Sequence, residues 1–415
     1  MKKGKSRLLR LASFSMALLL SASMSGCGFE MRKTQQGKPV GAKMVVIGQS
    51  KGIQFWDFVE QGAKDAGTEL EYSVEYCAAN DTSDIDGQKK LIKEAIDKNA
   101  KAIIVAPNSA TELNGVIRDA LDKGIVVMTI NSDVDNQSLR TTYVGTMNAS
   151  AGAIAARQAL TYMSDPDHYY EELPGKFGIV THSVELSSAQ ERVNTFISAL
   201  GGPLQGVYGP LMGQKMAKLA AQRAQQGGGE GQQGAPDGEG QQGAPGGEGQ
   251  QGAPGGQGQQ GAAGGQGQQL SPEFFIAAQE CCEGDADIAK ELATKMINEH
   301  PEMKVIYATN ERSTVGVCEA VVDARKEGKA TDLMVIGYNA NKDEQDYIQN
   351  DILTGTMLQN PYNIGYLSIL YAGNQLTDQS APGMVDTGVV YVNKQNLQHD
   401  DIQLLLDPKA FIAKK

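Results

Sequence analysis

Residues 102–131 read AIIVAPNSATELNGVIRDALDKGIVVMTIN and contain the pattern that determines the fold. Two apolar runs, 102–107 and 124–131, flank an amphipathic segment over 111–123. Short apolar runs that alternate with segments of 3.6-residue periodicity are typical of parallel strands covered by helices on both faces. The stretch therefore predicts a strand, a helix and a second strand parallel to the first.

The same alternation continues in both directions along the chain. Further apolar runs occur at 44–50, 71–77, 176–182, 274–279, 304–310 and 333–339, and amphipathic segments at 55–70, 88–98, 149–163, 188–200, 288–298 and 314–327. A chain of 415 residues is long enough for two such units, each with its own core. We therefore predict an α/β protein of two similar, doubly wound lobes with parallel sheets.

Polar residues follow many of these apolar runs. In open parallel sheets, ligands bind at the carboxyl ends of the strands. The side chains at these ends are Gln49, Asn131, His182, Asn310, Tyr338, Asn339 and Gln359. The sequence therefore predicts a small-molecule site built from strand ends.

Residues 1–26 have the features of an export signal. Five basic residues precede an apolar run at 11–20, and small residues lead up to Cys27. The run is too short for a transmembrane anchor, which needs about 20 residues, and the residues before Cys27 resemble a bacterial lipobox. We predict a lipoprotein signal peptide over 1–26, lipidation of Cys27 and a tether over 27–43, with cleavage elsewhere and free secretion as the alternative. The expected location is the outer face of the bacterial cytoplasmic membrane or the periplasm.

The net charge argues against a nucleic-acid partner. Removal of residues 1–26 takes away five of the 37 basic residues and none of the 49 acidic ones, so the formal charge changes from −12 to −17. Binding to a phosphate backbone needs clustered Lys and Arg. We expect no binding to nucleic acid.

The mature chain keeps four cysteines after Cys27, namely Cys77, Cys281, Cys282 and Cys318. Their spacing matches neither a zinc site nor a small disulfide-rich domain. We expect buried free thiols, and pairing of one of the two adjacent cysteines is the alternative.

A glycine-rich segment interrupts the second lobe. From 228 to 267, glycine stands at every third position except Asp237, the register of a collagen triple helix. The repeat nevertheless has a period of nine residues and contains only three prolines, at 236, 245 and 254, whereas collagen-like chains have about 15–20%. We predict a disordered insertion over 227–269 in a helix-to-strand loop, with a weak collagen-like trimer as the alternative.

Five segments, in order, resemble the sugar-binding branch of the type 1 periplasmic binding proteins, typified by ribose- and galactose-binding proteins. They are GIQFWDFVEQGAKDAGTEL (52–70), GIVVMTINSDVD (124–135), YVGTMNASAG (143–152), SSAQERVNTF (187–196) and VIGYNANKDE (335–344). The resemblance implies two Rossmann-like lobes joined by three crossover segments, with the ligand cleft between them. The N-terminal lobe would comprise 44–145 plus 360–387, and the C-terminal lobe 146–359 plus 388–405.

The resemblance also marks ligand-binding positions. It matches aromatic residues that stack on a sugar ring to Phe55 and Trp56, and an arginine that grips the ligand to Arg192. The other matching positions are Asn131, Asn310, Tyr338, Asn339 and Gln359, to which we add Gln49 at the first strand end. The alternatives are that Phe55 anchors its helix in the core and that Arg192 pairs in solvent with Glu185 or Glu191. A capping box of Ser188 and Glu191 would place Arg192 in the first turn of its helix.

Two asparagines depart from the family pattern. Sugar binders of this family usually have Asp where Asn131 and Asn339 stand, and the ribose branch has Arg where Ser132 stands. An amide has one acceptor and one donor group, whereas a carboxylate only accepts. The departures favour a ligand with a different polar pattern: an aldopyranose, a modified sugar, a polyol or an anionic sugar derivative. His182 and Glu185, in a second-lobe loop facing the cleft, are further candidate contacts.

Sequence motifs of nucleotide-binding enzymes and metalloproteases are absent. No GxGxxG follows the first strand, and neither GxxxxGK[ST] nor HExxH occurs. We therefore expect no enzymatic activity, cofactor or metal. The predicted function is that of a monomeric, lipid-anchored solute-binding protein that delivers a small sugar or sugar-like ligand to an ABC permease. The alternative is a binding component that presents a sugar to a sensor kinase or chemoreceptor.

Deletion of residues 227–269 should leave the mature protein a monomer with a nearly unchanged melting temperature. Long surface loops cost little, because closure entropy changes by only about 0.6 kcal/mol for each doubling of loop length. Light scattering before and after deletion measures the mass. A trimer that becomes a monomer on deletion would instead support a collagen-like segment.

Overall fold

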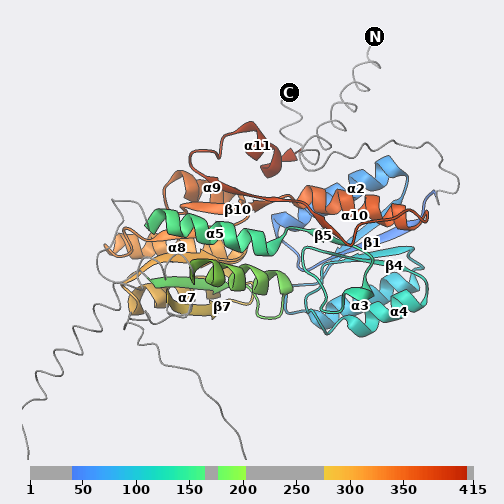
Figure 1. The fold of residues 1–415 in the computed structure, drawn as a ribbon, viewed down its shortest axis with the longest axis horizontal. Helices are drawn as coiled ribbons and strands as arrows, with labels where there is room; N and C mark the ends of the chain where they lie inside the picture. The colour runs from blue at the N-terminus through green and yellow to red at the C-terminus, as the bar shows by residue number, and fades with distance from the viewer. Residues whose placement is uncertain (1–39, 164–175, 202–274, 409–415) are drawn as a thin grey trace, which may run out of the picture. The chain divides into compact units, whose positions relative to one another are not determined.

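The computed structural model describes residues 40–163, 176–201 and 275–408. The predicted signal peptide, Cys27, residues 27–39 of the predicted tether and the insertion at 227–269 lie outside these ranges. The described residues form two lobes, each built around a six-stranded sheet (Figure 1). This architecture confirms the predicted fold class.

The N-terminal lobe contains a fully parallel sheet in the order β11-β5-β4-β3-β1-β2. Its elements are β1 (Lys43–Gly48), α2 (Gln54–Leu70), β2 (Ser73–Ala78), α3 (Ile85–Asp97), β3 (Ala102–Val105), α4 (Asn114–Asp122), β4 (Val126–Ile130), the 3-10 turn η1 (Gln137–Leu139), β5 (Tyr143–Gly145), α10 (Pro361–Gln375) and β11 (Met384–Asp386).

The C-terminal lobe repeats this strand order as β12-β10-β9-β8-β6-β7, except that β12 runs antiparallel to β10. Its elements are α5 (Asn148–Met163), β6 (Lys176–Thr181), a helix over 187–201, β7 (Ile276–Cys281), α7 (Ala286–Glu299), β8 (Met303–Ala308), α8 (Glu311–Lys326), β9 (Met334–Tyr338), α9 (Lys342–Gln349), β10 (Gly355–Gln359), β12 (Val389–Asn393) and α11 (Asp400–Leu406).

Strand β1 is buried on both faces, which explains the continuous apolar run of its sequence. Met44 and Val46 pack toward α2 and α10, whereas Val45 and Ile47 pack toward α3 and α4 on the opposite face (Figure 1). Side chains of a strand alternate between faces, so both sets must be apolar when helices cover both sides. The two sheets thus separate four hydrophobic clusters.

The chain passes between the lobes three times. It leaves the first sheet after β5 and enters α5, whose alanines pack in the core of the second lobe. It returns between β10 and α10, and crosses again between β11 and β12. The three crossings bring the two sets of strand ends to the same region of the molecule.

All four cysteines that the structure describes are free, as predicted. Cys282 and Cys318 are buried, but Cys77 and Cys281 are only partly buried, so the expectation of burial was wrong for these two. Burial raises the pKa of Cys77 and of Cys282 to about 11, which keeps both as thiols at neutral pH.

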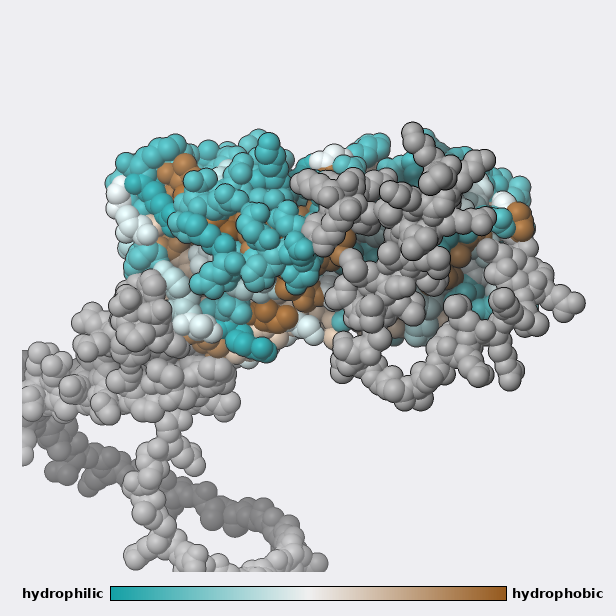
Figure 2. Space-filling view, turned by 90° about the horizontal axis from the view of Figure 1, so that it is seen from above, coloured by the Kyte–Doolittle hydropathy of each residue, from teal (hydrophilic) through white to brown (hydrophobic). Residues whose placement is uncertain are grey.

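The described surface is mainly hydrophilic on the face shown in Figure 2, where hydrophobic residues appear in small groups. Large hydrophobic side chains are exposed at Val40, Met147, Val184, Ile288 and Met384. Within the three described ranges, every helix is too short or too polar to cross a membrane.

Two glycines allow α2 and α10 to touch. A Cβ atom on Gly62 of α2 would overlap the carbonyl oxygen of Tyr362, and one on Gly365 of α10 would overlap the carbonyl oxygen of Val59. The two helix backbones therefore meet directly at these positions. This contact fixes α10, which follows a strand of the C-terminal lobe, onto the N-terminal lobe.

Gly62→Ala should lower the free energy of unfolding by about 1–3 kcal/mol, the usual cost of overpacking, because the backbone of α10 cannot move aside without disturbing the core. Urea denaturation followed by circular dichroism measures the change. The control is Gly115→Ala in α4, where a Cβ meets nothing within 4 Å and alanine should stabilise the helix by about 0.5–1 kcal/mol. Equal effects of the two substitutions would contradict the close contact.

Candidate ligand-binding site

A cleft lies where strand ends of the two lobes face each other. It encloses about 410 Å³, including the part open to solvent. Its lining residues are Gln49, Ser50, Ile53, Phe55, Trp56, Thr82, Asn131, His182, Arg192, Asn310, Glu311, Asn339 and Gln359. Eight of the nine residues predicted to bind ligand are among them, and Tyr338 is the exception.

Asn131 and Asn339 occupy equivalent places in the two lobes. Each directly follows the fourth strand of its lobe, β4 or β9, and each has left-handed backbone geometry, with φ of 61° and 74°. Asparagine tolerates this conformation better than most residues, because its short side chain can bond locally. The backbone turns sharply at both points and directs each amide toward the cleft.

Asn131 belongs to a buried amide network in the N-terminal lobe. Gln49 donates from Nε2 to the carbonyl oxygen of Pro107 at 2.9 Å, and Asn131 donates from Nδ2 to Oε1 of Gln49 at 3.0 Å. Asn131 Oδ1 is buried and has no hydrogen-bond partner among the described residues. A ligand donor at this point would satisfy it.

Arg192 lies in the second turn of the helix over 187–201, not in the first turn as predicted. The predicted capping box is wrong: Ser188 lies inside the helix, and its buried hydroxyl has no partner among the described residues. Instead, Ser183 Oγ accepts from the backbone N–H groups of Glu185 and Leu186, just before the helix begins.

The guanidinium of Arg192 is almost completely buried, with 3% of the residue exposed. It donates from Nε to Asn148 Oδ1 at 2.9 Å, from Nη1 to the Thr309 carbonyl oxygen at 2.7 Å and from Nη2 to Gln359 Oε1 at 3.4 Å. The predicted alternative, a solvent pair with Glu185 or Glu191, is therefore wrong. A guanidinium has five N–H donors, so the remaining ones can serve a ligand in the cleft.

Tyr338 lies beneath the site and not in its lining. It is fully buried, and its ring centroid is 3.6 Å from Cζ of Arg192. A cation over an aromatic face is attracted to the ring electrons. Tyr338 therefore positions Arg192 and has no surface on the cleft.

Phe55 and Trp56 begin α2 at the rim of the cleft. Their rings meet edge to face, with centroids 4.9 Å apart and planes at 85°. Both line the cleft, and both also belong to the core cluster of the N-terminal lobe. Phe55 therefore meets both predicted alternatives, because its side chain packs in the core and also lines the cleft.

His182 also lines the cleft, whereas Glu185 is exposed outside its lining. The Nδ1 atom of His182 is 2.7 Å from Thr309 Oγ1. Burial, followed by the charge of Arg192, holds the pKa of His182 well below its ordinary value. His182 is therefore neutral at physiological pH.

Glu311 is a lining residue that the sequence did not suggest. Asn310 caps α8 by accepting from Ser313 N at 2.8 Å, and Glu311 follows as the first helical residue. Its carboxyl accepts from Asn341 Nδ2 at 3.1 Å, and burial raises its pKa. Ser50, Ile53 and Thr82 are the other unpredicted lining residues; Ser50 and Thr82 lie in loops that leave β1 and β2, so the rule for strand ends could have identified them.

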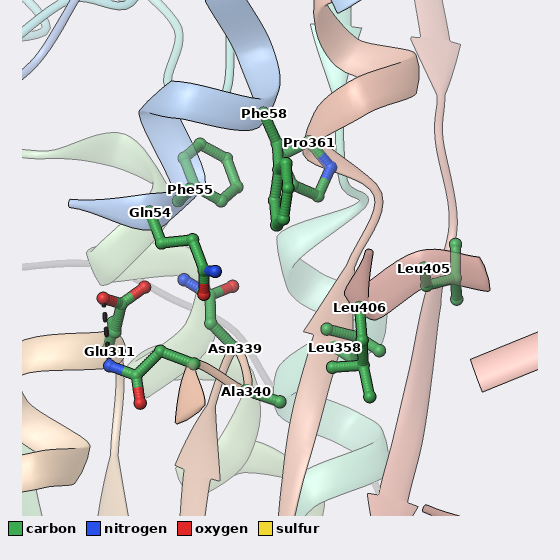
Figure 3. Close-up of a pocket in the computed structure, with 11 residues that line it drawn as sticks. Gln54, Phe55, Phe58, Glu311, Asn339, Ala340, Leu358, Pro361, Leu405 and Leu406 are labelled. Carbon is green, nitrogen blue, oxygen red and sulfur yellow. Dashed lines mark hydrogen bonds between the residues drawn. The ribbon is translucent and has the colours of Figure 1, made fainter. Parts of the chain in front are cut away.

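A second pocket adjoins the cleft and shares Phe55, Glu311 and Asn339 with it. Figure 3 shows Gln54, Glu311 and Asn339 on one side of this pocket and Leu358, Leu405 and Leu406 on the other. The leucines come from β10 and α11. The cleft thus continues from a polar centre into an apolar recess.

Two serines connect the opposite lobes beside the cleft: Ser132 lies in the loop after β4, and Ser187 begins the helix over 187–201. Ser187 Oγ lies 3.0 Å from Ser132 Oγ and accepts from Asp133 N at 2.9 Å. Asp133 is itself held by Arg140, whose Nε and Nη2 bond to both carboxylate oxygens. We call these contacts of Ser132, Asp133 and Ser187 the serine latch.

Residues 48–52, GQSKG, match the GxSxG pattern of serine hydrolases. The hydroxyl of Ser50 is buried and has no hydrogen-bond partner among the described residues. A nucleophilic serine needs a base within hydrogen-bond reach, so this serine lacks the required neighbour. In the same three ranges, no group of three or more His, Cys, Asp or Glu side chains could hold a metal ion.

Two lobes of repeated topology that enclose a polar cleft at their strand ends define a two-lobe binding protein. The chain matches the model of the periplasmic binding protein domain over residues 44–233 and 208–380. It belongs to the periplasmic binding protein family, in the type 1, ribose- and galactose-type branch that the sequence resembles.

Curated relatives and solved structures agree with this assignment. The chain is 22% identical over 330 residues to the D-allose-binding periplasmic protein of Escherichia coli, covering 78% of this chain and 81% of that protein. It is 21% identical to the D-ribose/D-allose-binding protein of Pseudomonas aeruginosa, covering 78% and 80%. A carbohydrate transporter solute-binding protein of Agrobacterium radiobacter, crystallised with D-arabinose, has the same fold, with a TM-score of 0.66, 19% identity and coverage of 88% and 99%. These relatives are sugar-binding transport proteins and not enzymes, in agreement with the prediction.

Glu344→Gln should stabilise the protein at pH 8 and leave stability unchanged at pH 4. Glu344 is fully buried near Glu311, and burial raises its pKa well above 4.5. The pKa of Glu344 is therefore higher in the folded protein than in the unfolded chain. The free energy of unfolding falls as the pH rises from the unfolded-state pKa to the folded-state pKa. Glutamine keeps the acceptor that Asn341 N uses at 2.8 Å and removes the charge, which should add at least about 1 kcal/mol at pH 8.

Urea denaturation at the two pH values measures this difference. The control is Glu299→Gln, an exposed carboxylate at the end of α7, which should change stability little at either pH. A Glu344→Gln variant that is equally stable or less stable than the natural protein at pH 8 would contradict the buried charge.

Proposed function

We propose that this protein is an extracytoplasmic solute-binding lipoprotein that captures a small sugar or sugar-like ligand and delivers it to an ABC transporter. The observation that carries the proposal is that eight predicted binding residues from both lobes line one cleft. Membership in the periplasmic binding protein family supports it further. In this proposal Cys27 carries the lipid, and residues 27–43 tether the lobes to the membrane.

The chemistry of the lining suits a polyhydroxylated ring. Phe55 and Trp56 offer aromatic surface at one rim, and Asn131, Asn339 and Arg192 offer hydrogen-bonding groups around it. Specific small-molecule sites combine an apolar surface with a few well-placed polar groups in this way. The sugars in the names of the relatives, D-allose, D-ribose and D-arabinose, are the first candidates for the ligand.

Closure of the lobes would transmit the bound state to the transporter. The proposed lobes are 44–145 plus 360–387 and 146–359 plus 388–405, which meet at the three crossings. A ligand that contacts both lobes stabilises the closed arrangement more than the open one. The transporter would then distinguish loaded from empty protein by the relative position of two lobe surfaces.

A thermal-shift screen of D-allose, D-ribose, D-arabinose, polyols and sugar acids tests the proposal. A ligand at 100 times its dissociation constant stabilises the folded state by about 2.7 kcal/mol, which should raise the melting temperature by about 3–5 °C. Trp56 is the only tryptophan in the chain and lines the cleft, so the same ligand should also change its fluorescence. A confirmed ligand that leaves the emission of Trp56 unchanged at saturation would argue against binding in this cleft.

Arg192→Ala should weaken binding of the confirmed ligand by about 1.5–3 kcal/mol, the value for a hydrogen bond to a charged group. The control is Arg157→Ala, which removes an exposed arginine from α5 and leaves the cleft lining intact. Calorimetry with both variants compares the dissociation constants. Equal affinities would exclude Arg192 from the binding site, and circular dichroism verifies that each variant is folded.

A further inference from the structure

The orientation of each amide in the cleft is fixed by partners that have only one hydrogen-bonding role. Amide oxygen and nitrogen atoms look alike in most structures, so their assignment must follow from the network. A backbone carbonyl only accepts, and a guanidinium only donates. The fixed partners are the carbonyl oxygen of Pro107 in the N-terminal lobe, and Arg192 and the backbone N–H of Ser313 in the C-terminal lobe.

In the N-terminal lobe the fixed partner is the carbonyl oxygen of Pro107. Gln49 must direct Nε2 toward it, at 2.9 Å, and this leaves Oε1 of Gln49 to accept from Asn131 Nδ2 at 3.0 Å. Reversing either amide would place two acceptors or two donors in contact. This leaves Oδ1 of Asn131, which is buried and has no partner among the described residues, as the unused acceptor of a residue that lines the cleft.

In the C-terminal lobe one fixed partner is Arg192. Its Nη2 donates to Gln359 Oε1 at 3.4 Å, so Gln359 directs Nε2 toward Asn339 Oδ1, at 3.0 Å. This leaves Nδ2 of Asn339 for the cleft. Asn310 has the same polarity, because its Oδ1 accepts from Ser313 N in the cap of α8, and only its Nδ2 remains.

We propose that the cleft is polarised: Asn131 presents an acceptor from the N-terminal lobe, whereas Arg192, Asn310 and Asn339 present donors from the C-terminal lobe. This assignment rests on the proposed function. The ligand class is a polyhydroxylated molecule with a hydroxyl toward Asn131 and an acceptor oxygen, that of a carboxylate or of a sugar ring, toward the three donors. Gln49 and Gln359 are the positioning residues that set the two polarities.

The charged neighbours of the donors are few. Arg192 has no ion pair with a carboxylate among the described residues. Its charge acts on the neighbouring Glu191, where burial raises the pKa of the carboxyl and the charge of Arg192 opposes that rise. Glu311 is the carboxyl group that lines the cleft on this side, and it is bonded to Asn341 and shared with the adjoining pocket.

Ligand-free melting temperatures of Asn131→Asp and Asn339→Asp test the two orientations. Both positions have positive φ, so the backbone cost of the substitution is matched. An Asp at 131 opposes Oε1 of Gln49 with an acceptor, whereas an Asp at 339 keeps its acceptor opposite Nε2 of Gln359. We expect Asn131→Asp to melt about 3 °C or more below Asn339→Asp at pH 7.5.

Asn131→Asp and Asn339→Asp are also compared in a Glu311→Gln background, which excludes an effect of the charge of Glu311 on the difference in melting temperature. Equal melting temperatures, or the reverse order, in both backgrounds would overturn the assigned polarities.

Calorimetry with D-ribose, D-allose, D-ribonate and D-allonate tests the ligand class. Asn339→Asp should lose affinity at least about tenfold, because it replaces a donor by an acceptor. The control Arg157→Ala, an exposed residue of α5 outside the cleft lining, should stay within about threefold. Tighter binding of D-ribonate or D-allonate than of the aldoses identifies a ligand carboxylate that accepts from Arg192, Asn310 and Asn339. Binding of the aldoses alone, with the same loss in Asn339→Asp, identifies a neutral acceptor oxygen.

Asn339→Asp that binds as tightly as the natural protein would overturn the donor role. If none of the four probes binds the natural protein, the proposed function fails for these sugars and sugar acids. The melting temperatures still decide the polarity in that case, because they are measured without ligand.

Discussion

A buried guanidinium must keep its hydrogen bonds, since removing a charge from water without partners costs far more than one contact can return. Arg192 meets this requirement through Asn148 of α5, the Thr309 carbonyl after β8 and Gln359 at the end of β10, while the ring of Tyr338 lies against it. Four elements of one lobe therefore converge on one planar group. This convergence holds the C-terminal half of the cleft: α5, β8 and β10 cannot move without leaving a donor or acceptor unsatisfied, and β9 cannot move without losing the ring contact.

Repetition of topology places corresponding strand ends opposite each other, but it does not fix their chemistry. β1 leads to Gln49 and β6 to His182, whereas β4 and β9 both lead to an asparagine with left-handed geometry. The two asparagines share backbone conformation and position, and they differ in the group that anchors each network. A carbonyl oxygen anchors one network, and a cation anchors the other. Identical residues at equivalent places thus acquire different roles from neighbours distant in sequence.

Much of this arrangement could be predicted from the sequence, because apolar runs and strand-end rules depend on local pattern. The strands at 44–50, 102–107 and 124–131 and the lining position of Asn131 follow from such patterns. Tyr338 illustrates the limit: as the last residue of β9 its side chain enters the core, while Asn339, one residue later, reaches the cleft. The S-x-x-E pattern predicts a cap at Ser188, but Ser183, five residues earlier, accepts the backbone N–H groups just before the helix. Glu311 and the amide orientations depend on tertiary partners, which local pattern does not reveal.

The serine latch has a consequence for timing. Beside the cleft, Ser187 of the C-terminal lobe bonds to Ser132 and Asp133 of the N-terminal lobe, and Arg140 holds Asp133 in place. The two lobes cannot separate at this edge of the cleft until these contacts break. The rate of separation would then depend on how often a few hydroxyl and amide contacts break together, in addition to the contacts made by a bound molecule. Mutations in loops that never touch the bound molecule can therefore lengthen or shorten its residence.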